Sequence, residues 1–408
     1  MGLRELGRVA KIWSYRWEFE IFHEFGKKFW RNSSIMKSSP IRPALSEILS
    51  ILMPSPEETQ LLQACLWPGE PGRQAWTKWQ RGVGDPVELL KNGNERLKSL
   101  LPLIYTGLRD NNIVVEESLQ TCLRTGYMRE ELRINTYRRI LSRVLSAYTE
   151  KQIPLIVLRG AALAETVYDS PSRHSGEIEI LFGDFESFRA ALSSLPSGFQ
   201  VSDGEIGPAI RQIKLVHESG LPLFLHLKPI PIAYYDLSFK DLWKRSQIRT
   251  IAGVPARILS PTDNLMQVCG TAFCSRSRRS LLWAFDSWLI ITKYSKLDWN
   301  GLLTSARRHH LELPLSITLG YLAEELNAPI PVSFLESLHN GASKTDSEGQ
   351  AYALSVALDE MRLGHLRTLT AQLVSNRQWR TLAYVIRRLF LSPVNSLRRF
   401  WPIHNSKA

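Results

Sequence analysis

The stretch from Ile153 to Phe182, IPLIVLRGAALAETVYDSPSRHSGEIEILF, constrains the fold of this chain more than any other. Its apolar run at 155–158 predicts a short buried strand. Arg159 and Gly160 end that run, and residues 161–167 predict a helix. A second strand is predicted over 177–182, where apolar and acidic residues alternate. The order strand, turn, helix, loop and strand favours a mixed α+β core.

Two acidic side chains share one face of the second predicted strand. Glu177 and Glu179 are separated by one residue, so they point the same way with Cα atoms about 6–7 Å apart. This spacing suits a pair of divalent ions about 3.5–4 Å apart, the arrangement used for in-line phosphoryl displacement. A Glu-x-Glu pair is also typical of the solvated face of an amphipathic edge strand. The pair alone therefore leaves both interpretations open.

A glycine turn one helix upstream favours the phosphoryl-transfer interpretation. Gly160 stands at the start of the predicted helix, where free N–H groups and the positive end of the helix dipole attract phosphate. Glycine is needed where a ligand approaches the backbone closely. A phosphate-binding turn and an acidic pair within about twenty residues indicate a nucleotide site.

The same stretch resembles the polymerase-beta-like nucleotidyltransferases, and most of all the branch called uncharacterised nucleotidyltransferases. Members carry a Lys-Gly turn, a helix with a Tyr near its end, an Arg before a Gly-Asp-x-Asp strand, and later an acid-x-His strand. The corresponding positions here are Arg159-Gly160, Tyr168, Arg173, Gly176-Glu177-Ile178-Glu179 and Phe224-Leu225-His226. Trp283, Asp286 and Leu289 resemble the helical C-terminal part of the same family. The resemblance extends over residues 45–340.

This resemblance implies a protein that transfers a nucleoside monophosphate from a nucleoside triphosphate to an unknown acceptor by a two-metal mechanism. The acceptor is a small molecule, a sugar, a peptide or a protein. The resemblance assigns catalytic roles to Glu177, Glu179 and His226, Mg²⁺ binding to Glu177 and Glu179, and nucleotide binding to Arg159, Gly160, Ala161, Arg173 and Gly176. An ordinary loop arginine and a structural histidine are the alternatives for Arg173 and His226.

Three departures from the family pattern leave a second hypothesis open. Both family aspartates are glutamates here, which moves the ligand oxygens by one methylene, and Mg²⁺ tolerates little distortion. Arg159 replaces a lysine, so a forked cation stands in place of a point charge. Phe224 occupies the position of the third carboxylate and has no atom that binds a metal. The alternative is a catalytically degenerate nucleotidyltransferase fold that binds a nucleotide or a partner without turnover.

The charge of the chain is strongly positive and uneven. Net charge is +12 at pH 7, and residues 361–408 contain no Asp or Glu but nine Lys and Arg. Such a surface attracts anions, so nucleic-acid binding is a third and less favoured hypothesis. The basic, aromatic segment at 1–40 predicts either peripheral membrane contact or docking on the domain. Because the chain has no long uninterrupted apolar run and its four cysteines lack zinc-ligand spacing, we expect a cytoplasmic protein.

The predicted organisation is a small mixed sheet flanked by helical regions on both sides in the sequence. Residues 134–148 predict a strongly amphipathic helix that leads into the first strand. Residues 210–217 and 221–227 predict a hairpin, and 254–258 a short strand within an otherwise helical C-terminal region. The expected regions are a basic aromatic segment (1–40), an N-terminal helical region (41–152), a nucleotidyltransferase-like core (153–240), a C-terminal helical region (241–340) and a basic helical tail (351–408).

Overall fold

The structure, a computed structural model, describes residues 53–92, 95–203, 212–229, 237–272, 280–309 and 311–342. The predictions for the basic segments at 1–40 and 351–408 therefore concern residues outside the described part. Within the described ranges, no helix is long and apolar enough to cross a membrane.

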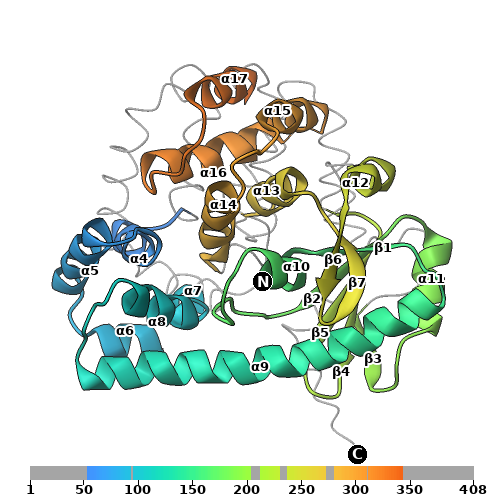
Figure 1. The fold of residues 1–408 in the computed structure, drawn as a ribbon, viewed down its shortest axis with the longest axis horizontal. Coiled ribbons are helices and arrows are strands. Elements are labelled where there is room, and N and C mark those ends of the chain that lie inside the picture. The colour runs from blue at the N-terminus through green and yellow to red at the C-terminus, as the bar shows by residue number, and fades with distance from the viewer. Residues whose placement is uncertain are drawn as a thin grey trace, which may run out of the picture. The chain divides into compact units, whose positions relative to one another are not determined.

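A seven-stranded mixed sheet forms the centre of the described chain, in the order β3-β4-β5-β2-β1-β7-β6 (Figure 1). Its strands are β1 (Leu155–Leu158), β2 (Ile178–Phe182), β3 (Phe199–Asp203), β4 (Gln212–His217), β5 (Pro222–His226), β6 (Gln247–Ile251) and β7 (Val254–Ile258). Strand β2 pairs antiparallel with β1 and parallel with β5, while β1 pairs parallel with β7. The predicted α+β class and mixed sheet are confirmed.

The two outermost strands, β3 and β6, were not predicted. The sequence of β6, QIRTI, lies in a region expected to be helical, so that expectation is wrong there. Both strands are edges of the sheet, and β6 buries only Ile251. An edge strand exposed on one side needs few apolar residues, which explains why its sequence shows no strand signal. The hairpin of β4 and β5 and strand β7 lie where they were predicted.

Helices surround this sheet in both sequence directions. Before it come α4 (Pro56–Leu66), α5 (Glu70–Gly82), α6 (Pro86–Asn92), α7 (Glu95–Lys98), α8 (Leu101–Asp110) and α9 (Glu117–Glu150). Within the strand region lie α10 (Arg159–Thr166), α11 (Phe185–Ser193) and α12 (Phe239–Arg245). After it come α13 (Pro261–Gly270), α14 (Leu282–Lys293), α15 (Trp299–Arg308), α16 (Glu312–Glu324) and α17 (Val332–Ala342).

One face of the sheet packs against the C-terminal half of α9 and against α11. The predicted amphipathic positions of α9, from Ile140 to Tyr148, belong to the same apolar core as Ile178, Ile180 and Phe182. Alternate residues of a strand point to opposite faces, so Glu179 lies on the other face of β2. Figure 1 shows α9 running along the sheet on one side, with α10 and the later helices α13 and α14 on the other. The sheet therefore separates an apolar layer from a layer that carries polar side chains.

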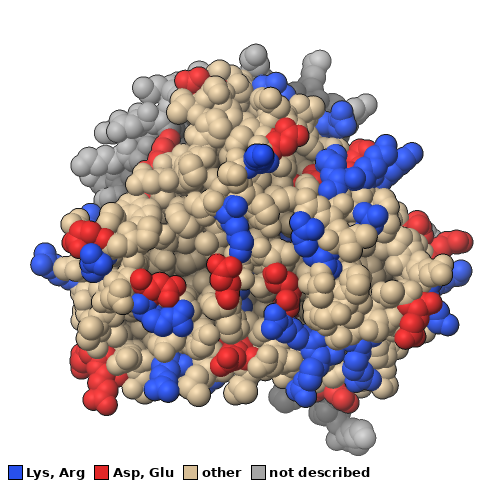
Figure 2. All heavy atoms as spheres, in the orientation of Figure 1, with Lys and Arg blue, Asp and Glu red and all other residues tan. Residues whose placement is uncertain are grey.

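The surface of this region mixes both signs of charge, with Lys and Arg gathering where α12 lies (Figure 2). Exposed Lys240, Lys244 and Arg249 belong to α12 and β6. Arg257 stacks on the Trp243 ring at 4.3 Å, and Arg245 pairs with Asp263. Part of this basic charge is therefore engaged within the molecule itself.

Aromatic packing fixes α9 and α11 to the sheet. The Phe182 ring lies edge-on to Tyr148 and Phe188, with centroids 5.9 and 6.2 Å apart. All three side chains are among the largest that are fully buried.

Replacing Phe182 with alanine should therefore leave a cavity and lower the free energy of unfolding by about 3–5 kcal/mol. Urea denaturation monitored by circular dichroism measures this loss. Val201→Ala is the control, because Val201 is exposed on the edge strand β3, and should cost less than about 1 kcal/mol. Equal losses for the two variants would contradict this account of the core.

Candidate functional site

Three predicted site residues meet on the polar face of the sheet, and we call them the Arg159–Glu179–His226 cluster. Arg159 follows β1 directly and begins α10. Its guanidinium forms an ion pair with Glu179 Oε1, and its Nη1 lies 3.5 Å from the hydroxyl of Thr271 just after α13. The Nε2 atom of His226, the last residue of β5, lies 3.2 Å from the same Glu179 oxygen. The structure thus brings two residues that are 20 and 47 positions away from Glu179 in the sequence next to its carboxylate.

The backbone of Arg159 adopts a conformation that is uncommon for its residue type. Its φ angle is +38°, in the left-handed region that residues with a side chain rarely enter. Such conformations cost free energy and persist where the surrounding structure holds them, often at functional sites. The ion pair with Glu179 is one of the contacts that can hold this turn.

Glu179 is the centre of the cluster and is almost completely buried, with 4% of its surface exposed. In the register of the sheet it lies between Leu158 of β1 and Phe224 of β5. Burial alone would raise the pKa of its carboxyl, but Arg159 and His226 outweigh this effect and hold the pKa at about 2. The carboxylate is therefore ionised at neutral pH, and side chains of the protein itself neutralise it.

His226 is 1% exposed and lies beside Phe224, with ring centroids 6.2 Å apart. Its Nδ1 atom is buried and has no hydrogen-bond partner among the described residues. The side-chain oxygen of Gln267 on α13 is also buried and has no hydrogen-bond partner within the described ranges. The amide nitrogen of the same side chain donates to the Pro229 carbonyl. Buried polar atoms are nearly always paired, so unsatisfied ones in a candidate site call for an explanation.

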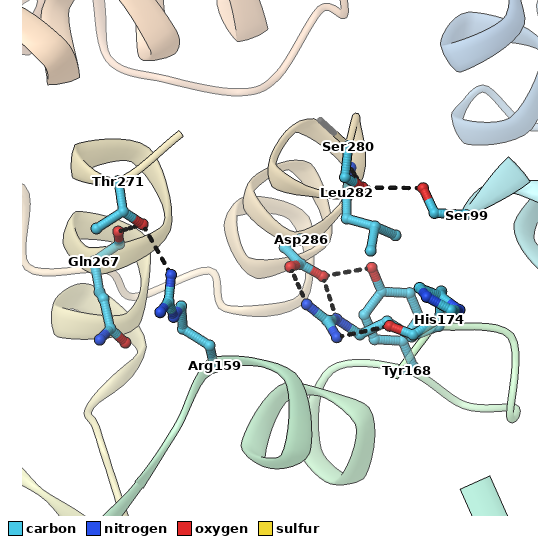
Figure 3. A network of polar contacts seen from close by, with 10 residues as sticks. Ser99, Arg159, Tyr168, His174, Gln267, Thr271, Ser280, Leu282 and Asp286 are labelled. Atoms are coloured by element: carbon cyan, nitrogen blue, oxygen red, sulfur yellow. Dashed lines mark hydrogen bonds and ion pairs between the residues drawn. The ribbon is translucent and has the colours of Figure 1, made fainter. Parts of the chain in front are cut away.

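A second buried group is the Arg173–Asp286–Tyr168 cluster, and Figure 3 labels its Tyr168 and Asp286 together with Arg159 of the first cluster. Arg173 donates through Nε and Nη2 to the two oxygens of Asp286, both at 2.8 Å, and through Nη1 to the His174 carbonyl. The Tyr168 hydroxyl donates to Asp286 Oδ1 at 2.7 Å. Burial lowers the pKa of Arg173, but Asp286 more than reverses this effect, and burial raises the pKa of Tyr168. This cluster fastens the segment between α10 and β2 to helix α14.

Gly160 lies between the two clusters, and the structure gives a reason for glycine at this position that the sequence did not reveal. A Cβ atom at this position would lie 2.8 Å from Arg173 Nη1 and 3.7 Å from the Glu177 carbonyl oxygen. The absence of a side chain thus leaves room for the guanidinium of Arg173. The φ angle of Gly160 is not positive, so close approach, and not backbone conformation, accounts for glycine at this position.

The remaining predicted site residues lie near these clusters. Ala161 is half-buried in the first turn of α10, next to Gly160. Gly176 is exposed in the segment that precedes β2. Glu177 is half-buried and stands one residue before β2, which begins at Ile178, so it precedes the strand in which it was predicted.

Sequence reasoning missed the residue that holds this segment to α9. Glu130 is buried on α9, where its carboxylate lies 2.7 Å from His174 Nδ1 and accepts a hydrogen bond from the Ser175 backbone N–H at 2.7 Å. A single acid within a long helix carries no signal that it will be buried. Glu130 is four residues before Ile134, on the buried side of the helix, and this spacing is the one indication the sequence offered.

Of the two residues predicted to hold Mg²⁺, Glu179 has partners of its own within the protein. Its Oε1 atom lies beside Arg159 and His226, and Phe224 is its neighbour in the register of the sheet. Within the described ranges, no three His, Cys, Asp or Glu side chains are grouped closely enough to hold a metal ion. The cluster is arranged as an internal ion pair.

The sequence model described as "Uncharacterised nucleotidyltransferase" matches residues 96–327. The chain belongs to this family. The resemblance noted in the sequence is thus confirmed, and the matched residues include both clusters. Family membership implies a nucleoside triphosphate as the ligand.

Among solved structures, the chain is similar to an antigenic nucleotidyltransferase-like protein from Paracoccidioides brasiliensis, at 16% identity over 48% of this chain and 95% of that one, with a TM-score of 0.32. It is also similar to a putative nucleotidyltransferase from H. pylori, at 12% identity over 51% of this chain and 92% of that one, with a TM-score of 0.28. No curated protein matches the chain. At such low TM-scores, the family match alone carries the assignment.

Gly160→Ala should destabilise the protein, although alanine normally stabilises a helix relative to glycine. The new methyl group would collide with a guanidinium that two hydrogen bonds to Asp286 fix in place. Overpacking of this kind costs about 1–3 kcal/mol, measurable by urea denaturation. Gly176→Ala is the matched control, because the nearest atom to its new methyl group would be 3.7 Å away. A neutral or stabilising Gly160→Ala would show that Arg173 is not held there.

Asp286→Asn should be strongly destabilising, because it leaves the buried guanidinium of Arg173 without its counter-charge. Loss of one partner of a buried ion pair costs about 3–5 kcal/mol. The control is Asp169→Asn, which makes the same chemical change in an exposed ion pair with Lys293 and should have little effect. Thermal and urea unfolding of both variants measure the difference. Similar stabilities would refute a structural role for the Arg173–Asp286–Tyr168 cluster.

Proposed function

We propose that this family member binds a nucleotide at the turn between β1 and α10, and that it does so without the two-metal centre of an active transferase. Arg159 is the ligand for the phosphates in this proposal, and α10 supplies the positive end of its dipole. The catalytically degenerate alternative drawn from the sequence is thus preferred to transfer of a nucleoside monophosphate.

Support for nucleotide binding comes from the place of Arg159 in the family turn. It opens α10, at the position where the family carries a lysine, and helix N-termini favour phosphate. A guanidinium forms paired hydrogen bonds with phosphate oxygens in a fixed geometry. The family match, which covers this turn, supports the same ligand class.

The state of Glu179 is the observation that carries the second half of the proposal. A carboxylate that holds Mg²⁺ must present free oxygens in a nearly octahedral arrangement. Glu179 instead neutralises Arg159 in a buried site, and its neighbour across the sheet is Phe224. Mg²⁺ would have to displace a cation that belongs to the protein itself, in a region from which water is largely excluded.

Calorimetric titration of ATP, GTP, CTP and UTP tests this proposal, first in EDTA and then with excess Mg²⁺. We expect at least one nucleotide to bind in EDTA, with an affinity that Mg²⁺ changes by less than about threefold, or about 0.65 kcal/mol. A coupled assay for pyrophosphate release should detect no Mg²⁺-dependent turnover.

Arg159→Gln should abolish this binding, whereas Arg138→Gln should leave it intact. Arg138 is the matched control because it also pairs with a glutamate, Glu165, but from the surface of α9. Absence of nucleotide binding under all conditions would refute the proposal. Mg²⁺-dependent pyrophosphate release that disappears in Glu179→Gln would support the active transferase instead.

A further inference from the structure

In the proposed site, two different anions can pair with the guanidinium of Arg159. Arg159 pairs with Glu179 in the structure, and the proposed function requires it to pair with a phosphate. We infer that Glu179 is a built-in competitor of polyphosphate for Arg159, so that the site binds its ligand by exchanging an internal carboxylate for an external phosphate. This inference rests on the proposed function and adds to it how binding at the site is restrained.

The exposures of the three side chains favour such an exchange. Arg159 retains 16% of its side-chain surface, whereas Glu179 retains 5% and His226 2%. A ligand arriving from solvent therefore meets the guanidinium before it meets the carboxylate. The Arg159 Nη1 contact with Thr271 is at 3.5 Å, the limit of a hydrogen bond.

His226 leaves Glu179 with one polar neighbour during such an exchange. When Arg159 turns toward a phosphate, Glu179 keeps His226 Nε2 at 3.2 Å. A buried carboxylate that loses every partner would make the exchange prohibitively costly. The His226 Nδ1 atom and the Gln267 side-chain oxygen are both buried without hydrogen-bond partners in the described part of the chain.

The ion pair reduces the apparent affinity of the site. Only molecules in which Arg159 has left Glu179 can bind the ligand. The apparent affinity is the intrinsic affinity multiplied by the fraction of molecules in that state. Removing the competing charge should therefore strengthen binding. A metal-ligand role for Glu179 predicts no gain in EDTA, where no metal is bound, and this difference makes the inference testable.

The experiment compares Glu179→Gln with wild type by calorimetric titration of inorganic tripolyphosphate and of the four nucleotides in EDTA. We expect Glu179→Gln to bind about tenfold more tightly, a change of about 1.4 kcal/mol. Glu165→Gln is the matched control, because Glu165 of α10 is also a glutamate paired with an arginine, but its partner is Arg138 and not Arg159. It measures the general effect of removing one negative charge from this helix and should change affinity by less than about twofold.

A double substitution tests whether the gain passes through Arg159. In an Arg159→Gln background, Glu179→Gln should give no gain in affinity, because the guanidinium for which carboxylate and phosphate compete is absent. If Glu179→Gln does not fold, as judged by circular dichroism, Glu179→Asp replaces it. The aspartate keeps the charge but shortens the reach by one methylene, so a smaller gain, about threefold, is expected.

The outcomes separate this inference from the proposed function. If neither wild type nor Glu179→Gln binds any of the probes, the proposed function fails. If wild type binds in EDTA and Glu179→Gln binds equally or more weakly, nucleotide binding stands and the competition is refuted. Equal gains for Glu179→Gln and Glu165→Gln would reduce the effect to general electrostatics and also refute the inference.

Discussion

The buried carboxylate of Glu179 is the constraint on which the rest of the site depends. A charge with 4% of its residue surface exposed is tolerated only when other groups neutralise it. Arg159 provides this neutralisation from the end of β1, and His226 lies beside the acid at the end of β5, so both come from the two strands that flank β2. The order of the strands in the sheet therefore decides which side chains can reach the Glu179 carboxylate.

The second cluster performs a comparable task for the chain between α10 and β2. Arg173 is fixed to Asp286 on α14, and its guanidinium occupies the space left open at Gly160. Glu130 holds the neighbouring residues His174 and Ser175 from α9. Helices that precede and follow the strands in the sequence thus hold the segment that leads into β2. The family match likewise extends well beyond the strands.

Much of the core was predictable, because its elements obey simple periodicities. The strands β1 and β2, the amphipathic positions of α9 and the hairpin of β4 and β5 follow from apolar runs and turn residues. The partners of the charged residues were not predictable. Nothing in the sequence indicates that Arg173 meets a residue 113 positions away, or that Arg159 turns toward Glu179. Long-range pairing of this kind depends on how the helices pack, which local patterns do not record.

The three departures from the family pattern become coherent when they are considered as one charge-balanced group. A glutamate reaches one methylene further than an aspartate, and a guanidinium offers donors in a fork, so this pair suits a direct contact that shorter or point-charged residues would make less well. A third acid in place of Phe224 would sit beside Glu179 in the register and add a second buried negative charge. Phenylalanine avoids that repulsion and excludes water, which strengthens the remaining ion pair. In the proposed function, the same changes that disfavour a metal therefore favour a site that holds its own cation.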